Sequence, residues 1–150
     1  MATISWGKPK IEVCAFVSGA LPVSPVWTPL TNIKQDSTKL TTSKGAKEEA
    51  KIEGGELLDV RFSKNGYSLE CELYVAKGAS KPITDVDGVV DVNYAVRVTP
   101  EDATQAGFII DKASVQLEES FTAKDGKTWK YTFEALKPAT GELLKEYTEE

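Results

Sequence analysis

The stretch LLDVRFSKNGYSLECELYV, residues 57–75, decides the fold, because apolar and polar residues alternate along most of it. Successive side chains of a strand point to opposite faces, so this alternation predicts half-buried antiparallel strands. Between the two alternating runs, Lys64-Asn65-Gly66 is typical of a type I′ turn, whose central residues need positive φ. The stretch therefore predicts a β-hairpin, with one strand presenting Leu58, Val60 and Phe62 and the other presenting Tyr67, Leu69, Cys71, Leu73 and Val75.

The same alternation predicts four more strands, at residues 11–17, 92–98, 113–117 and 129–135. Turn residues at 85–88 and 124–127 precede two of them. Glu119 stands at a position whose neighbours in the alternation, Leu117 and Phe121, are apolar. We therefore expect a bulge or bend there.

One short helix is expected at residues 99–107. Thr99 is a suitable N-cap, Pro100 suits the first helical position, acids fill the first turn, and Gly107 would end the helix. The predicted fold class is all-β, an antiparallel β-sandwich or barrel with one short flanking helix.

The 150 residues suit a single domain, residues 1–150. Within it, residues 19–29 form a Pro-rich loop, since proline cannot donate to a strand ladder. Residues 34–56 are poor in large apolar groups and rich in Lys, Glu, Thr and Gly. They predict a protruding polar hairpin or loop, or an edge that pairs with another chain. Residues 141–150 are expected to be a flexible tail, or else a frayed helix.

The composition narrows the function classes. Hydrophobic residues make up 41% and charged residues 27%, which is typical of a globular chain. The net charge of −5 and the pI near 4.9 argue against binding nucleic acid through its phosphates, or anionic lipid. No apolar run reaches the length of a membrane helix and the N-terminus does not resemble a signal peptide, so we expect a chain made in the cytoplasm.

The chain has no histidine, which removes Ser-His-Asp and Cys-His catalysis and the commonest proton shuttle at neutral pH. Its two cysteines, Cys14 and Cys71, lie in strand-like runs and are predicted to be buried apolar side chains. Without histidine they cannot form the usual zinc site. Most acids are expected on the solvated faces of strands. We therefore expect no enzyme, no cofactor and no metal.

Two further patterns have competing interpretations. The stretch Asp85-Val86-Asp87-Gly88 with Asp91 partly matches a calcium loop, but the remaining ligand positions do not fit. A hairpin turn is favoured there over a weak cation site. Trp129 is on the apolar side of its strand and is predicted to be in the core, whereas Trp6 and Trp27 cover an edge or lie in an interface.

Over most of residues 30–137 these features resemble bacteriophage tail tube proteins (major tail proteins), a family related to type VI secretion tube proteins. The resemblance rests on residues 33–37 leading into 45–55, the hairpin at 57–75, the short helix after Val98, and residues 121–129 leading into the last strand. The Pro-rich insertion at 19–29 has no counterpart in the resemblance.

The resemblance implies a structural subunit that self-assembles. Family members fold as a small β-sandwich or barrel with a helix, and form hexameric rings that stack into a tube conducting DNA. A long loop contacts the neighbouring ring, which on this analogy is residues 36–55. The candidate ring-stacking contacts are Lys44, Lys47, Glu48, Glu49 and Lys51.

The resemblance also implies partners and a location. The partners are copies of the chain itself and sheath, tape-measure or tail-terminator proteins, and the location is the virion tail. DNA would pass through the lumen without specific binding, and an acidic lumen would repel its phosphates. Two alternatives stay open: a monomeric ligand- or carbohydrate-binding β-sandwich that uses Trp6 or Trp27, and an enzyme that uses carboxylates alone.

Overall fold

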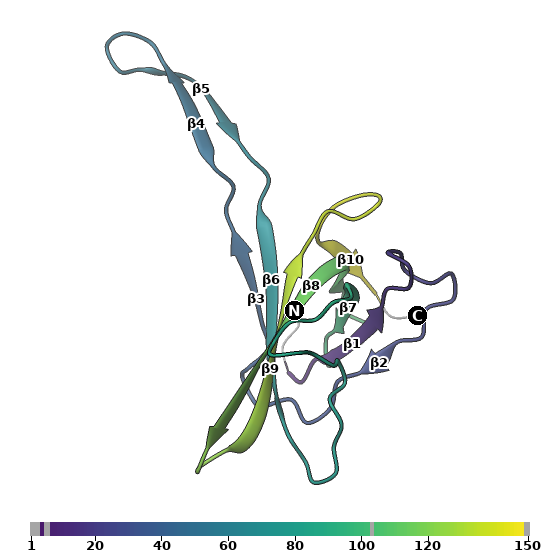
Figure 1. The fold of residues 1–150 in the computed structure, drawn as a ribbon. Coiled ribbons are helices and arrows are strands. Elements are labelled where there is room, and N and C mark those ends of the chain that lie inside the picture. The colour runs from purple at the N-terminus through teal and green to yellow at the C-terminus, as the bar shows by residue number, and fades with distance from the viewer. Residues whose placement is uncertain (1–3, 5–6, 103, 149–150) are drawn as a thin grey trace.

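The computed structural model describes residue 4, residues 7–102 and residues 104–148, and it is all-β (Figure 1). Its pairings are antiparallel throughout the described residues, which confirms the predicted class. The strands are β1 (Lys10–Ala15), β2 (Thr28–Pro29), β3 (Lys39–Ser43), β4 (Lys47–Lys51), β5 (Leu57–Phe62), β6 (Gly66–Tyr74), β7 (Tyr94–Thr99), β8 (Gly107–Thr122), β9 (Gly126–Ala135) and β10 (Lys145–Tyr147).

The main sheet runs in the order β2-β1-β7-β8-β9-β6-β3, with β10 added to β8. The segment after β2 joins its two sides. Thr28 and Pro29 pair with β1, while Ile33 forms a bridge with Leu73 of β6. The Lys34 N–H then donates to the Glu72 carbonyl at 2.7 Å. Residues 28–34 therefore span from β1 to β6 and close the sheet into a barrel.

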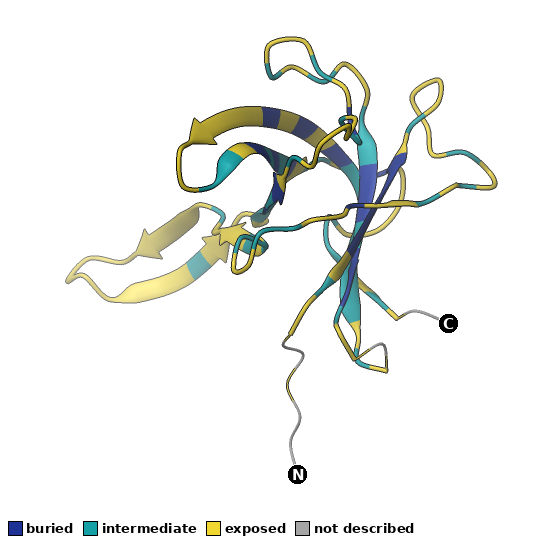
Figure 2. Cartoon of the chain, turned by 90° about the horizontal axis from the view of Figure 1, so that it is seen from below, coloured by how far each residue is buried: buried dark blue, intermediate teal, exposed yellow. Residues whose placement is uncertain are grey.

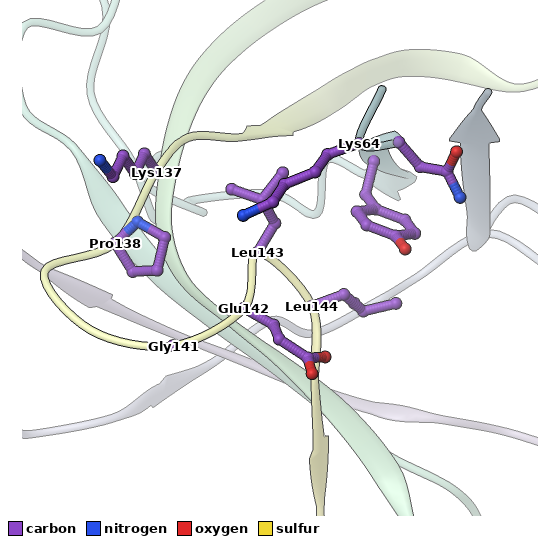
Figure 3. Close-up of a pocket in the computed structure, with 9 residues that line it drawn as sticks. Lys64, Lys137, Pro138, Gly141, Glu142, Leu143 and Leu144 are labelled. Atoms are coloured by element: carbon purple, nitrogen blue, oxygen red, sulfur yellow. The ribbon is translucent and has the colours of Figure 1, made fainter. Parts of the chain in front are cut away.

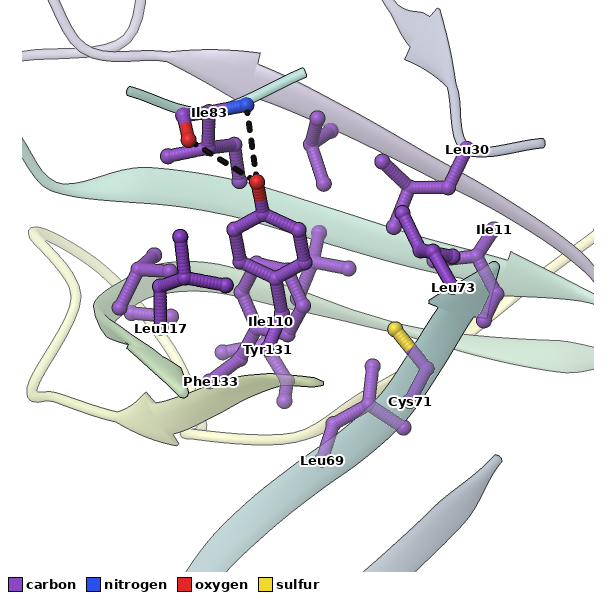
Figure 4. Packing of buried hydrophobic residues seen from close by; sticks show 14 of the residues in the cluster. Ile11, Leu30, Leu69, Cys71, Leu73, Ile83, Ile110, Leu117, Tyr131 and Phe133 are labelled. Atoms are coloured by element: carbon purple, nitrogen blue, oxygen red, sulfur yellow. Dashed lines mark hydrogen bonds between the residues drawn. The ribbon is translucent and has the colours of Figure 1, made fainter. Parts of the chain in front are cut away.

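The core fills this barrel with the apolar positions that the alternation predicts (Figure 2, Figure 4). On strands β6, β8 and β9 the predicted inward faces are confirmed, with buried side chains at Leu69, Cys71, Leu73, Ala113, Val115, Leu117, Trp129, Tyr131 and Phe133. Strands β1 and β7 add Ile11, Val13, Val96 and Val98. Each of the larger side chains contributes about 1.5–3 kcal/mol when it leaves water.

The loop between β6 and β7 seals one part of this core. Its Ile83 is fully buried, and both of its backbone groups meet the Tyr131 hydroxyl (Figure 4). The hydroxyl donates to the Ile83 carbonyl at 2.9 Å and accepts from the Ile83 N–H at 3.4 Å. Burial raises the pKa of Tyr131 to about 12. The tyrosine therefore fastens a long loop to the middle of β9.

The outer face of β1 and β7 is covered as well. Buried Glu12 accepts a hydrogen bond from Arg97 Nε at 3.0 Å. The Arg97 guanidinium lies 4.2 Å from the centroid of the Trp27 ring and 5.0 Å from that of Tyr147. Both cysteines are free and buried, as predicted, and burial raises the pKa of Cys71 to about 12.

The predicted hairpin at residues 57–75 is wrong in its pairing. Strand β5 pairs with β4, whereas β6 pairs with β3 and β9. The chain turns instead at Gly54 and Gly55, with φ of 96° and 89°, a backbone region that suits glycine. Asn65 is not in a turn, and its side-chain oxygen accepts from the Gly45 N–H at 3.1 Å. Alternation shows which face of a strand is buried but not which strand is its partner.

The predicted helix at residues 99–107 is also wrong. Strand β7 ends at Thr99 and β8 begins at Gly107, with Val98 directly opposite Phe108. The described residues between them form bends and a turn, in which the Asp102 carboxylate accepts from the Thr104 N–H and hydroxyl at 3.1 and 2.6 Å. Asp and Thr that favour helix caps also favour such turns. Across the described ranges no helix is long and apolar enough to cross a membrane.

Two smaller expectations fail for local reasons. Strands β8 and β9 keep one register from Ala113 opposite Ala135 to Thr122 opposite Gly126, so there is no bulge at Glu119. The buried face of β8 ends at Leu117: Glu119 is exposed, where it accepts from Trp129 Nε1 at 3.1 Å, and Phe121 is exposed as well. The C-terminal segment, expected to be a flexible tail, contains β10, and Lys145 in that strand pairs with Asp111.

Candidate assembly interface

Residues 44–65, called the arm from here on, project from the barrel as a two-stranded extension (Figure 1). Strands β3 and β6 pair at its base, and β4 and β5 pair beyond them. The two pairs are separated by a short break, across which the Ser63 N–H donates to the Ala46 carbonyl at 2.8 Å. The β3–β6 and β4–β5 pairs therefore form one continuous two-stranded ribbon. Its outer part, the arm, lies away from the barrel core.

Glycines allow the ribbon to form at two places. At the break, a Cβ on Gly45 would lie 2.0 Å from the Ser63 carbonyl oxygen, so only glycine fits this close approach of two backbones. At the far end, the Gly54-Gly55 turn is held by Ile52, which accepts from the Gly55 N–H at 3.1 Å and donates to the Glu56 carbonyl at 3.0 Å.

The register of the arm defines two different faces, because directly opposite residues share a face. On the first, Lys47 lies opposite Phe62 and Glu49 opposite Val60, and alternation adds Leu58. On the second, Glu48 lies opposite Arg61 and Ala50 opposite Asp59. The first face, called the apolar face of the arm, is defined by Leu58, Val60 and Phe62.

The apolar face has almost no cover in this chain (Figure 2). Leu58 is 72% exposed and Phe62 is 68% exposed. A lone two-stranded hairpin is only marginally stable in water, and three strands or packing on another element are normally needed. The arm therefore has exposed apolar area that a contact could bury, and it has little internal stability of its own.

Exposed ion pairs follow the strands of the arm. Lys47 and Lys51 reach Glu49 at 2.8 and 3.5 Å, and Arg61 pairs with Glu48. Exposed pairs of this kind contribute only about 0–1 kcal/mol, so they exchange readily for contacts with another molecule. Charge on the arm therefore contributes little to folding.

The candidate contacts taken from the sequence all lie on the arm. Strand β4 carries Lys47, Glu48, Glu49 and Lys51, and Lys44 lies in the break between β3 and β4. The structure brings Lys47, Glu49 and Lys51 together on one face and puts Glu48 on the other. Their role as contacts between subunits stays a prediction.

Sequence reasoning missed the apolar half of this surface. It assigned Leu58 and Phe62 to a hairpin with β6, although their strand pairs with β4. One signal was present: Gly54-Gly55 lies between two runs of similar length, residues 47–51 and 57–62. A glycine pair centred between two such runs indicates that the runs pair with each other as a hairpin. The apolar residues of its second strand, β5, then have no other element to pack against.

The calcium-like stretch forms a turn. Asp87 and Gly88 have φ of 50° and 87°, and the Asp85 carboxylate accepts from the Gly88 N–H at 2.7 Å. Lys81 Nζ donates to the same carboxylate, also at 2.7 Å. Lys81 first, and then the Gly88 N–H, hold the pKa of Asp85 below its usual value. Within the described ranges no group of His, Cys, Asp or Glu is arranged to hold a metal ion.

The tryptophans do not form a binding platform where the structure describes them. Trp129 is buried in the core, as predicted. Trp27 is half-buried, and its ring face is occupied by the Arg97 guanidinium. Trp6, the other residue considered for an edge or an interface, lies outside the described residues.

Comparison with known proteins adds no family to this picture. No protein-family model matches the chain, and no curated protein matches it. The geometry of the arm therefore carries the functional interpretation.

Proposed function

We propose that the chain is a structural subunit that assembles with copies of itself, forming rings that stack into a phage tail tube or a similar tube. One observation carries this proposal: the arm presents an apolar face, with Leu58 and Phe62 exposed, that its own barrel does not cover. Contiguous exposed apolar area on a protruding element is typical of an interaction surface.

A second copy is the partner that the sheet itself favours. Strand β3 is an end strand of the main sheet, so the edge facing away from β6 has unpaired backbone groups. Burying one Leu or Phe side chain stabilises a contact by about 1.5–3 kcal/mol. Repeated around a ring, contacts of that size would order an arm that is marginal in a single chain.

The finer features of the proposal follow from the resemblance to tail tube proteins. They are hexameric rings, a lumen that conducts DNA, partners among sheath, tape-measure and tail-terminator proteins, and a place in the virion tail. The net charge of −5 supports the lumen, since acidic walls repel phosphate. On this proposal the chain has no enzymatic role.

The alternative, a monomeric carbohydrate-binding module, has less support. Sugar-binding platforms need an open aromatic face, and Trp27 offers its face to Arg97 instead. Trp129 donates its indole N–H to Glu119 within the barrel wall. The arm would also have no task in such a module.

Polar substitution of the apolar face tests the proposal. The double variant Leu58→Asn with Phe62→Asn keeps the register of the arm but removes its exposed apolar groups. The matched control is Val23→Asn with Val86→Asn, two side chains that are as exposed but lie off the arm. Sedimentation velocity over a concentration series should show assemblies for wild type and control, and smaller species for the arm variant. A wild-type chain that stays monomeric at every concentration would overturn the proposal, and equal assembly of all three proteins would exclude the apolar face as the contact.

A further inference from the structure

Charge is segregated along the length of the arm. Its outer part, residues 48–59, has one base, Lys51, among five acids: Glu48, Glu49, Glu53, Glu56 and Asp59. Its inner part, residues 44–47 and 60–64, has no acid and four bases: Lys44, Lys47, Arg61 and Lys64. Every one of these residues is described by the structure. The arm is therefore acidic at its far end and basic where it joins the barrel.

A groove of about 680 Å³ opens beside the basic end (Figure 3). The arm base lines one side of it, and the segment between β9 and β10 lines the other. Its apolar lining comes from Tyr67, Pro138, Leu143 and Leu144, with Lys64 and Lys137 beside them. Glu142 is the acid among its lining residues. We call this the basal groove.

A second hollow extends the basic character of this region. It shares Lys64 and Asn65 with the basal groove and adds Lys44 and Lys47. Neither Lys64 nor Lys137 forms an ion pair with any residue that the structure describes. The groove therefore combines an apolar lining with lysines available to a partner.

The far end of the arm has the opposite and matching chemistry. Around the Gly54-Gly55 turn, Ile52 is 46% exposed and Leu57 is 50% exposed. Glu53 and Glu56 lie between them in the sequence, and within the described chain neither forms an ion pair. The arm tip, residues 52–57, thus offers two exposed large apolar side chains with two carboxylates between them in the sequence.

We infer that the arm tip of one copy docks in the basal groove of a second copy, with Glu53 and Glu56 facing Lys64 and Lys137. This inference rests on the proposed self-assembly and names the surface that receives the arm. The tip and the groove lie at opposite ends of one arm, so a chain does not fill its own groove (Figure 1). Tip and groove are different patches, and a heterologous contact that repeats from copy to copy builds rings or open stacks.

Charge pairs at the edge of such a contact set register and partner choice, and salt screens them. Ile52 and Leu57 would supply the apolar part of the contact and the lysine–glutamate pairs its orientation. Raising the salt concentration should therefore weaken the assembly without abolishing it.

Charge reversal on full-length chains tests the contact. One variant carries Glu53→Lys and Glu56→Lys, and another carries Lys64→Glu and Lys137→Glu. Each alone should weaken association at least about tenfold, because attractive pairs become repulsive ones. An equal mixture of the two variants should regain association, as should a single chain carrying all four substitutions. Sedimentation velocity at low salt gives the association constants of these proteins.

Matched reversals elsewhere control for net charge. Glu118→Lys with Asp91→Lys, and Lys77→Glu with Lys124→Glu, change equally many exposed charges away from the arm and the groove. They should associate as wild type does. Failure of both the mixture and the four-substitution chain to regain association would overturn the inference, as would equal weakening by the controls.

The inference and the proposed function can fail separately. If the Leu58→Asn, Phe62→Asn variant loses assembly while charge reversal changes nothing, the groove is the wrong receiving surface and the arm proposal stands. If that apolar variant assembles normally, the apolar face is not the contact. If the wild-type chain stays monomeric at every concentration, the proposed function itself is wrong.

Discussion

Tyr131 shows how a single residue joins two distant parts of this fold. Its ring belongs to the core of β9, and its hydroxyl meets both backbone groups of Ile83, 48 residues away. In Tyr131→Phe the ring stays, but the buried Ile83 carbonyl loses its donor. Leaving a buried acceptor unpaired costs about 1–3 kcal/mol, so the free energy of unfolding should fall by that amount in urea titration.

Tyr74→Phe is the matched control, because the Tyr74 side chain is exposed at the end of β6. It should leave the urea midpoint near that of the wild type. If Tyr131→Phe is as stable as this control, the hydroxyl does not fasten the loop.

Asp85 gives a prediction about pH. Lys81 and the Gly88 N–H lower the pKa of its carboxyl in the folded chain, whereas the unfolded chain keeps a value near 3.8. The carboxylate therefore stabilises the fold above pH 3.8, and this contribution disappears as the pH falls through the lower, folded pKa. Asp85→Asn should melt below the wild type at pH 7, and the two melting temperatures should converge in acid.

Asp91→Asn changes an exposed acid of the same loop and controls for net charge. Thermal melts from pH 7 to pH 3 compare the three proteins. A gap between wild type and Asp85→Asn that stays constant over this range would rule out the ion pair as its cause.

At the scale of elements, the arm depends on the break between the β3–β6 pair and the β4–β5 pair. In Gly45→Ala the new Cβ would lie 2.0 Å from the Ser63 carbonyl oxygen and 2.6 Å from that of Lys64, so the two backbones must separate. Hydrogen exchange of amides in β4 and β5 should accelerate, while amides of β6, β8 and β9 keep their protection.

Gly66→Ala provides the comparison, because the nearest atom to its Cβ is 3.8 Å away and its φ is not positive. It should leave exchange in the arm unchanged. Equal exchange in both variants would show that the close approach at Gly45 does not hold the arm in place.

The strands also show which features of the fold the sequence could predict. Alternation correctly indicated the buried faces of β6, β8 and β9, because burial of one face is a property of each strand alone. It did not indicate that β5 pairs with β4, since pairing depends on the geometry of turns at a distance. The capping pattern at Thr99 and Pro100 failed because Val98 and Phe108 are paired strand residues, and the short link between them must reverse direction.

Only the charged residues of the candidate site could be predicted from the sequence. Strand β4 has no large apolar residue, so the exposure of Lys47, Glu48, Glu49 and Lys51 follows from composition. The exposure of Leu58 and Phe62 does not, because an alternating strand is normally covered on its apolar face. On the proposed function, this local rule fails because a second copy, rather than the single chain, covers the apolar face.

At the scale of the whole molecule, the barrel and the arm differ in how much of their apolar surface the chain itself buries. The barrel closes on itself through residues 28–34 and has a buried core. The arm has exposed apolar groups, exposed ion pairs and no core. On the proposed function, the barrel folds alone and a second copy orders the arm.

Removing the arm separates these two roles and is the measurement to make first. Ser43 and Gly66 are register partners, so a two-residue Asn-Gly turn in place of residues 44–65 closes a plain β3–β6 hairpin. Light scattering after size exclusion, with negative-stain images, compares this variant with the full chain over a concentration series. We predict rings or stacks for the full chain and a folded monomer without the arm. A full chain that stays monomeric, or an armless chain that assembles equally well, would contradict assembly through the arm.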